Sequence, residues 1–117
     1  MIRRLTPLLA VVILVIAVLG CGGGSTSARD ASPADTAAIV MKDTTFQPAH
    51  VAVPARTTVT WTNGDQVPHN VKFDDGPSSD NLAFGATFQR VFDDPGTFDY
   101  ECTIHPGMIG RVTVNPR

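Results

Sequence analysis

The sequence predicts an all-β domain, a Greek-key sandwich or barrel, that follows an N-terminal export segment. Short runs that alternate apolar and polar residues recur after residue 36, and Gly, Pro, Asn and Asp separate them. Beyond the export segment no stretch has the roughly 3.6-residue period of an amphipathic helix. The length of 117 residues suits one domain, and the 43% of hydrophobic residues suits a globular chain.

Residues 1–20 are typical of an export signal. A basic start, Met1-Ile2-Arg3-Arg4, is followed by an unbroken apolar run from Leu8 to Leu19. As a helix this run would be about 18 Å long, well short of the roughly 30 Å of a bilayer core, which favours a signal over a membrane span. The arginine pair also fits a twin-arginine signal, but a basic pair opens most export signals.

The end of this segment, Val18-Leu19-Gly20-Cys21, resembles the lipobox of bacterial lipoproteins. The resemblance implies that Cys21 is lipidated, becomes the first residue of the mature chain and anchors it to the cell membrane, facing the periplasm or the extracytoplasmic side. The alternative is ordinary cleavage, which leaves Cys21 as a free thiol or as a disulfide partner of Cys102.

Residues 21–36 are predicted to form a flexible tether, because they are small and polar and have no large apolar side chain to bury. The folded domain is expected over residues 37–117. The whole chain has nine basic and eleven acidic residues, and loss of a signal that contains Arg3 and Arg4 leaves seven basic residues and a net charge of −4. Such a surface is unsuited to nucleic acid.

The first half of the domain contains three expected strands. They cover Ala37–Met41, His50–Val53 and Thr57–Thr62, with a turn at residues 43–45 between the first two. The third is the clearest, because β-branched hydroxyl residues alternate with Val59 and Trp61 until Asn63-Gly64 ends the pattern.

The second half continues the alternation. Val71 and Phe73 extend the face on which His69 lies, and a long loop follows over residues 74–79. The next apolar segment contains Phe88, Val91 and Phe92, but Arg90 interrupts its alternation.

The segment from Thr97 to Cys102 alternates cleanly. It places Phe98, Tyr100 and Cys102 on one face and the acids Asp99 and Glu101 on the other. A final strand is expected over residues 111–114.

Three potential metal donors follow directly, in Cys102-Thr103-Ile104-His105-Pro106-Gly107-Met108. Taken singly, Cys102 is more often a small buried hydrophobe, Met108 a core residue and His69 an ordinary histidine. Three donors at such regular spacing after an alternating strand favour a metal site, with His69 as a fourth donor. A thiolate, two imidazoles and a thioether suit copper, whereas zinc prefers four firm donors that do not include methionine.

The domain resembles the cupredoxins, or blue (type 1) copper proteins, and among them the plastocyanin and amicyanin group. The resemblance rests on Phe46-x-Pro48, Val59-x-Trp61-x-Asn63, Pro68-His69-Asn70-Val71, Phe92-x-x-Pro95-Gly96-Thr97-Phe98-x-Tyr100-x-Cys102 and His105-Pro106-x-Met108-x-Gly110-x-Val112. It implies one copper ion bound by His69, Cys102, His105 and Met108, with the short ligand loop of amicyanin.

The same resemblance gives Asn70 a supporting role. In the family an asparagine at this position ties the two ligand loops together, and its expected partner here is the backbone or hydroxyl of Thr103. One departure concerns the turn before the Trp61 strand, where the family usually has glycine and this chain has Ala55-Arg56.

The function implied by the resemblance is electron transfer by Cu(I)/Cu(II) cycling, without enzyme activity. The chain has only three histidines, too few for a second copper cluster, and no Ser/His/Asp set or paired-carboxylate motif. We expect a monomer that meets its redox partners transiently near His105, framed by Pro68, Pro106 and Gly107. The alternatives are a carrier or buffer that delivers the copper ion itself, and a metal-free interaction module.

Six acids offer a further means of steering a basic partner, although charged groups are usually just solvated. They are Asp74, Asp75, Asp93, Asp94, Asp99 and Glu101. His50 has no donor-spaced neighbours and is expected to be an ordinary surface residue.

Overall fold

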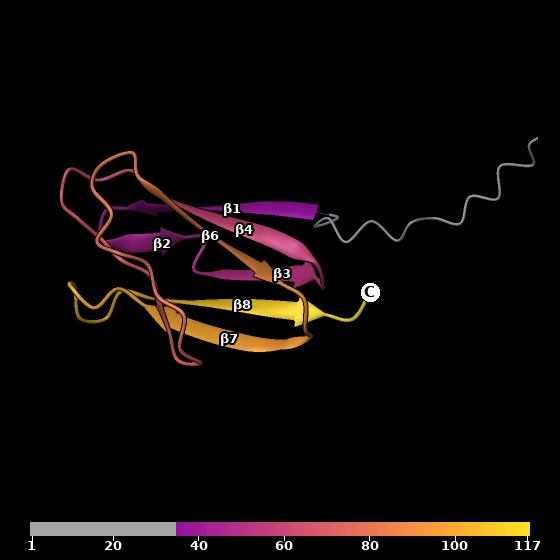
Figure 1. Ribbon diagram of the computed structural model, residues 1–117. Helices are drawn as coiled ribbons and strands as arrows, with labels where there is room; N and C mark the ends of the chain where they lie inside the picture. The colour runs from indigo at the N-terminus through magenta and orange to yellow at the C-terminus, as the bar shows by residue number, and fades with distance from the viewer. Residues whose placement is uncertain (1–34) are drawn as a thin grey trace, which may run out of the picture.

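The computed structural model describes residues 35–117, which form two stacked four-stranded sheets (Figure 1). The predicted export signal, the predicted lipidation residue Cys21 and most of the predicted tether lie outside the described residues. Among residues 35–117, no helix is long and apolar enough to cross a membrane.

Eight strands follow one another over residues 35–117. They are β1 (Asp35–Lys42), β2 (Thr45–Gln47), β3 (His50–Pro54), β4 (Thr57–Asn63), β5 (Lys72–Phe73), β6 (Thr87–Phe92), β7 (Gly96–Glu101) and β8 (Ile109–Asn115). One sheet has the order β2-β1-β4-β6 and the other β3-β8-β7-β5. Two neighbouring pairs, β1 with β4 and β3 with β8, are parallel, and the other pairs are antiparallel. The chain changes sheet at most connections, which confirms the predicted all-β sandwich.

The core is centred on Trp61 of β4. Its side chain is fully buried and packs edge-on against Phe73 and Tyr100, at ring-centroid distances of 5.6 and 5.3 Å. Phe73 and Tyr100 belong to the opposite sheet, so the indole joins the two layers. Full burial of a side chain of this size contributes on the order of 3 kcal/mol to folding.

The expected turn at residues 43–45 is wrong by one residue, because Thr45 already belongs to β2. The turn itself consists of Asp43 and Thr44, with φ angles of 52° and 56°. Two left-handed residues make the tight turn that matches strand twist in a hairpin, but such turns normally contain glycine or asparagine. The missing glycine concealed the strand that follows. At the other end of the hairpin, β1 begins at Asp35, two residues before the expected start of the domain.

The turn before β4 keeps a left-handed residue although the family's usual glycine is absent. Arg56 has a φ angle of 67°, and its N–H donates to the carbonyl oxygen of Phe92 at 2.6 Å. The left-handed conformation costs a non-glycine residue on the order of 1 kcal/mol, which the bonds to the neighbouring strand offset.

The residue that interrupts the alternation of β6, Arg90, faces inward together with Phe88 and Phe92. Its guanidinium lies 4.3 Å from the ring centroid of Phe73, and it also covers the rings of Phe92 and Phe98. The same group binds both carboxylate oxygens of Asp75, at 3.0 and 2.7 Å. Because β6 and β5 are the edge strands of the two sheets, Arg90 closes this side of the sandwich over the aromatic core.

We expect Arg90→Ala to destabilise the metal-free protein by about 1–3 kcal/mol in urea unfolding, because it removes cation–π contacts and packing over three rings. The matched variant Asp75→Asn removes only the ion pair, whose carboxylate is 45% exposed, and should cost less than about 1 kcal/mol. Equal losses of unfolding free energy in the two variants would show that the contacts of Arg90 with the aromatic rings do not stabilise the fold.

Candidate metal centre

Two connections carry the candidate donors to the same end of the sandwich, at the left in Figure 1. One is the β4–β5 connection with His69, and the other is the β7–β8 connection with Cys102, His105 and Met108. The first is fixed to the segment before β6 by a short bridge, in which the His69 N–H donates to the Leu82 carbonyl and the Leu82 N–H to the His69 carbonyl.

Three predicted donors meet at this end. The Sγ atom of Cys102 lies 3.8 Å from Nδ1 of His69 and 3.6 Å from Nδ1 of His105, and the two Nδ1 atoms are 3.1 Å apart. Three donors placed about 2.0–2.3 Å from one ion in their plane would be roughly 3.5–4 Å apart. The observed triangle is close to this size, so the two nitrogens and the sulfur fit one metal ion without a rearrangement of the backbone.

The three donors differ in exposure. His69 and Cys102 are buried, with exposed fractions of 0% and 2%, whereas His105 is only partly buried. Cys102 is a free thiol in the described part of the chain. The arrangement gives a site that is closed to solvent except on the side of His105.

Met108 lies in the same loop and is 3% exposed. The Cys102 N–H donates to the Met108 carbonyl at 2.9 Å, and the Met108 N–H donates to the His105 carbonyl at 3.1 Å. These bonds fold the loop back on itself, which brings the backbone of all three residues together. The role of the Met108 sulfur as a donor stays a prediction.

Asn70 makes the contact that was expected with Thr103, through both backbone and hydroxyl. Its Oδ1 accepts from the Thr103 N–H at 2.8 Å, and its Nδ2 donates to the Thr103 hydroxyl at 2.7 Å and to Oδ1 of Asn81 at 3.2 Å. The Asn70 N–H also approaches the Cys102 sulfur at 3.5 Å. One side chain thus joins the two donor connections and the segment before β6.

Asn63 is a supporting residue that the sequence did not reveal, because its position at the end of a strand indicated a turn. It is completely buried, and its Nδ2 donates to the carbonyl oxygens of Val67 and Leu82, both at 2.8 Å. Its Oδ1 accepts from the N–H of Asp65 at 2.8 Å. Both polar atoms of the Asn63 side chain therefore form hydrogen bonds, and these bonds shape the loop that leads to His69.

Asp65 is a second residue that sequence reasoning missed. Its Oδ2 lies 2.8 Å from Nε2 of His69, the ring nitrogen that faces away from Cys102. This hydrogen bond, with a further one from the Thr44 N–H, holds the pKa of Asp65 well below its usual range. The only sequence signal is its place four residues before the histidine.

Two of the six acids are paired with arginines. Asp75 is paired with Arg90, and Asp99 with Arg111 at 2.6 and 3.0 Å, so the pKa of each carboxyl is lowered by its arginine.

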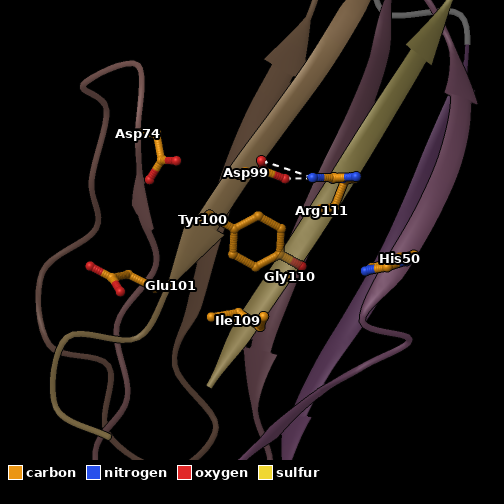
Figure 2. A pocket seen from close by; sticks show the side chains of 8 residues that line it. All are labelled: His50, Asp74, Asp99, Tyr100, Glu101, Ile109, Gly110 and Arg111. Carbon is orange, nitrogen blue, oxygen red and sulfur yellow. Dashed lines mark hydrogen bonds and ion pairs between the residues drawn. The ribbon is translucent and has the colours of Figure 1, made fainter. Parts of the chain in front are cut away.

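Three acids gather at a hollow of about 340 Å³ on the outer side of β7 and β8 (Figure 2). It is lined by His50, Asp74, Asp99, Tyr100, Glu101, Ile109, Gly110 and Arg111, and includes none of the four predicted donors.

Several apolar residues next to the two histidines in the chain are exposed. Pro106 and Gly107 are exposed beside His105, and Pro68 is exposed beside His69, whose ring centroid lies 4.8 Å from that of His105. Ile104 is also exposed, at 37%. The least buried donor therefore has exposed apolar residues on both sides in the chain, and the docking of partners there stays a prediction.

Comparisons with known proteins agree with this geometry. The sequence model of the Cupredoxin-like domain matches residues 10–114. Amicyanin-alpha of Methylorubrum extorquens is 36% identical over 104 residues, covering 84% of this chain and 87% of that protein. Plastocyanin of Scenedesmus fuscus is 37% identical over 95 residues, covering 69% and 92%. A solved structure, a purple cupredoxin from Nitrosopumilus maritimus, is 34% identical with a TM-score of 0.63, covering 68% of this chain and 99% of that one.

Asn70→Ala should destabilise the metal-free protein by about 1–3 kcal/mol in urea unfolding, because it removes two hydrogen bonds between the loops, each worth about 0.5–1.5 kcal/mol. Asn81→Ala is the matched control, since it removes one exposed hydrogen bond of the same network and should cost under about 1 kcal/mol. If Asn70→Ala lowered the free energy of unfolding no more than Asn81→Ala does, Asn70 would not be the residue that joins the loops.

Proposed function

Because the chain belongs to the cupredoxin-like family, we propose that it is an exported type 1 copper protein that carries single electrons between redox partners. The observation that carries this proposal is the cluster of His69, Cys102 and His105, whose donor atoms all lie within 4.8 Å of one another. The protein is an electron carrier and not an enzyme.

We propose that His69, Cys102 and His105 hold the copper ion and that Met108 is a weak fourth ligand. Two imidazoles, a thiolate and a thioether are a donor set that suits copper in both oxidation states. Copper supplies the redox chemistry, by cycling between Cu(I) and Cu(II). The chain supplies fixed donors: His69 is completely buried, and Asn70 ties its loop to that of Cys102 through Thr103. Little rearrangement then accompanies electron transfer.

His105 is the proposed point at which the electron enters and leaves. It is the only partly exposed member of the cluster, and the residues directly beside it in the chain, Ile104 and Pro106, are exposed, as is Pro68 beside His69. A small apolar surface favours brief, weak encounters with redox partners rather than a stable complex, and it is compatible with a monomer. The hollow that Glu101 helps to line has acidic groups on the outer side of β7, the strand that leads to Cys102.

The protein works on the extracytoplasmic side of the membrane, and we propose that a lipid on Cys21 anchors it there. The support for the anchor is the sequence Val18-Leu19-Gly20-Cys21 and the small polar segment that follows it. Such a segment would let the copper domain reach partners in the membrane.

Copper loading should give one ion per chain and an intense blue absorption that disappears on reduction while the copper stays bound. Cys102→Ser should abolish the absorption, because it removes the thiolate. His50→Ala is the matched control, since this exposed histidine lies outside the cluster, and it should leave stoichiometry and colour unchanged. The measurements are visible spectroscopy and metal analysis before and after reduction and gel filtration.

Two results would contradict the electron-transfer function and indicate a different one. Release of the copper on reduction would indicate a carrier that delivers the ion. Absence of stoichiometric copper would indicate a metal-free interaction module on the same scaffold.

For the anchor, mass spectrometry of the mature N-terminus should find an acylated Cys21, and Cys21→Ser should move the protein from the membrane fraction to the soluble exported fraction. An unmodified terminus at another residue would mean that the chain is processed by ordinary cleavage.

A further inference from the structure

The carboxylate of Asp65 receives donors from two parts of the chain. Its Oδ1 accepts from the Asp43 N–H at 3.0 Å, and its Oδ2 accepts from the Thr44 N–H at 3.1 Å. The Nζ atom of Lys42 lies 3.5 Å from Oδ1. All three donors belong to the β1–β2 hairpin, more than twenty residues earlier in the sequence. The fourth donor, on Oδ2, is Nε2 of His69 at 2.8 Å.

The hairpin turn has an unusual backbone conformation. Both Asp43 and Thr44 are left-handed, and for a β-branched residue such as Thr44 this conformation is a genuine outlier. Strained residues persist where the surrounding structure fixes them, and they often mark a functional constraint. Here the constraint is visible, because the conformation aims two successive N–H groups at one carboxylate, as in the backbone concavities that bind anions.

We propose that the β1–β2 turn is a positioning element of the metal centre, acting on His69 through Asp65. The turn fixes the carboxylate, and the carboxylate fixes the proton of His69 on Nε2. The unprotonated Nδ1 atom is then left facing Cys102 and His105, 3.8 and 3.1 Å away. A partner on the second ring nitrogen is what orients a ligating histidine and sets its tautomer.

The arrangement also has an electrostatic consequence. A carboxylate that is 12% exposed and bonded to a ligand imidazole favours the oxidised, more positive state of the centre. Asp65 therefore lowers the reduction potential. The effect on the reduction potential rests on the proposed copper function. The effect on the tautomer of His69 does not.

The first experiment needs no metal. Long-range ¹H–¹⁵N NMR of the apo full chain should show His69 as the Nε2–H tautomer, and Asp65→Ala should convert it to a mixture of tautomers. Gln47→Ala is the control, since Gln47 bonds within the same hairpin, to the Lys42 carbonyl and the Thr45 hydroxyl, but not to Asp65, and it should leave the tautomer unchanged. An unchanged tautomer in Asp65→Ala would overturn the proposal.

The second experiment measures the reduction potential of the copper-loaded protein in a double-mutant cycle. Asp65→Ala, or Asp65→Asn if the alanine variant folds poorly, should raise the potential. Insertion of two glycines between residues 43 and 44 should also raise it, because the released carboxylate no longer holds His69. In the Asp65→Ala background the insertion should cause no further shift.

Asp43→Asn removes one exposed charge from the same turn but keeps its N–H groups, so it should leave the potential nearly unchanged. An equal shift on insertion in both backgrounds, or none in either, would show that the turn does not act through Asp65. Failure of the unaltered chain to form a copper centre would instead refute the proposed function, and the tautomer measurement would still test the positioning role.

Discussion

The pair of hydrogen bonds between Asn70 and Thr103 is the constraint on which the centre depends. His69 and Cys102 are separated by more than thirty residues, and they leave different sheets: His69 follows β4, and Cys102 follows β7. The pairing of β5 with β7, which places Lys72 opposite Glu101, and the Asn70–Thr103 bonds together fix one loop relative to the other. The tie makes the spacing of the donors a property of the fold, so the donors need not be assembled by the metal.

The two sheets give the site its rigidity from opposite sides. Cys102 continues an alternating strand whose previous inward residue, Tyr100, packs on Trp61 in the core. His69 is held from the other layer, by Asn63 through its loop and by Asp65 through its ring. Since Trp61 joins the layers, a change of donor spacing would require the layers themselves to shift, which close packing resists.

Local patterns made much of this predictable from the sequence. The alternation of apolar and acidic residues predicted which side chains of β7 face inward. The spacing from Cys102 to Met108 predicted the loop that carries three of the donors. The remainder depends on contacts between distant residues. The turn was predicted one residue too long, over residues 43–45, and β2 was missed, because the turn has no glycine to mark where it ends. Arg90 disrupts a hydrophobic pattern because its guanidinium lies over aromatic rings, and Asp65 acquires its role only when the hairpin and His69 meet.

The most direct measurement of the central claim is a set of crystal structures of the apo, Cu(II) and Cu(I) forms. We expect one ion bound by His69, Cys102, His105 and Met108 in both oxidation states, with the two loops and the Asn70–Thr103 bonds in the same place in all three. An ion bound elsewhere, the loss of a donor on reduction, or loops that rearrange when the metal binds would contradict a preformed electron-transfer centre.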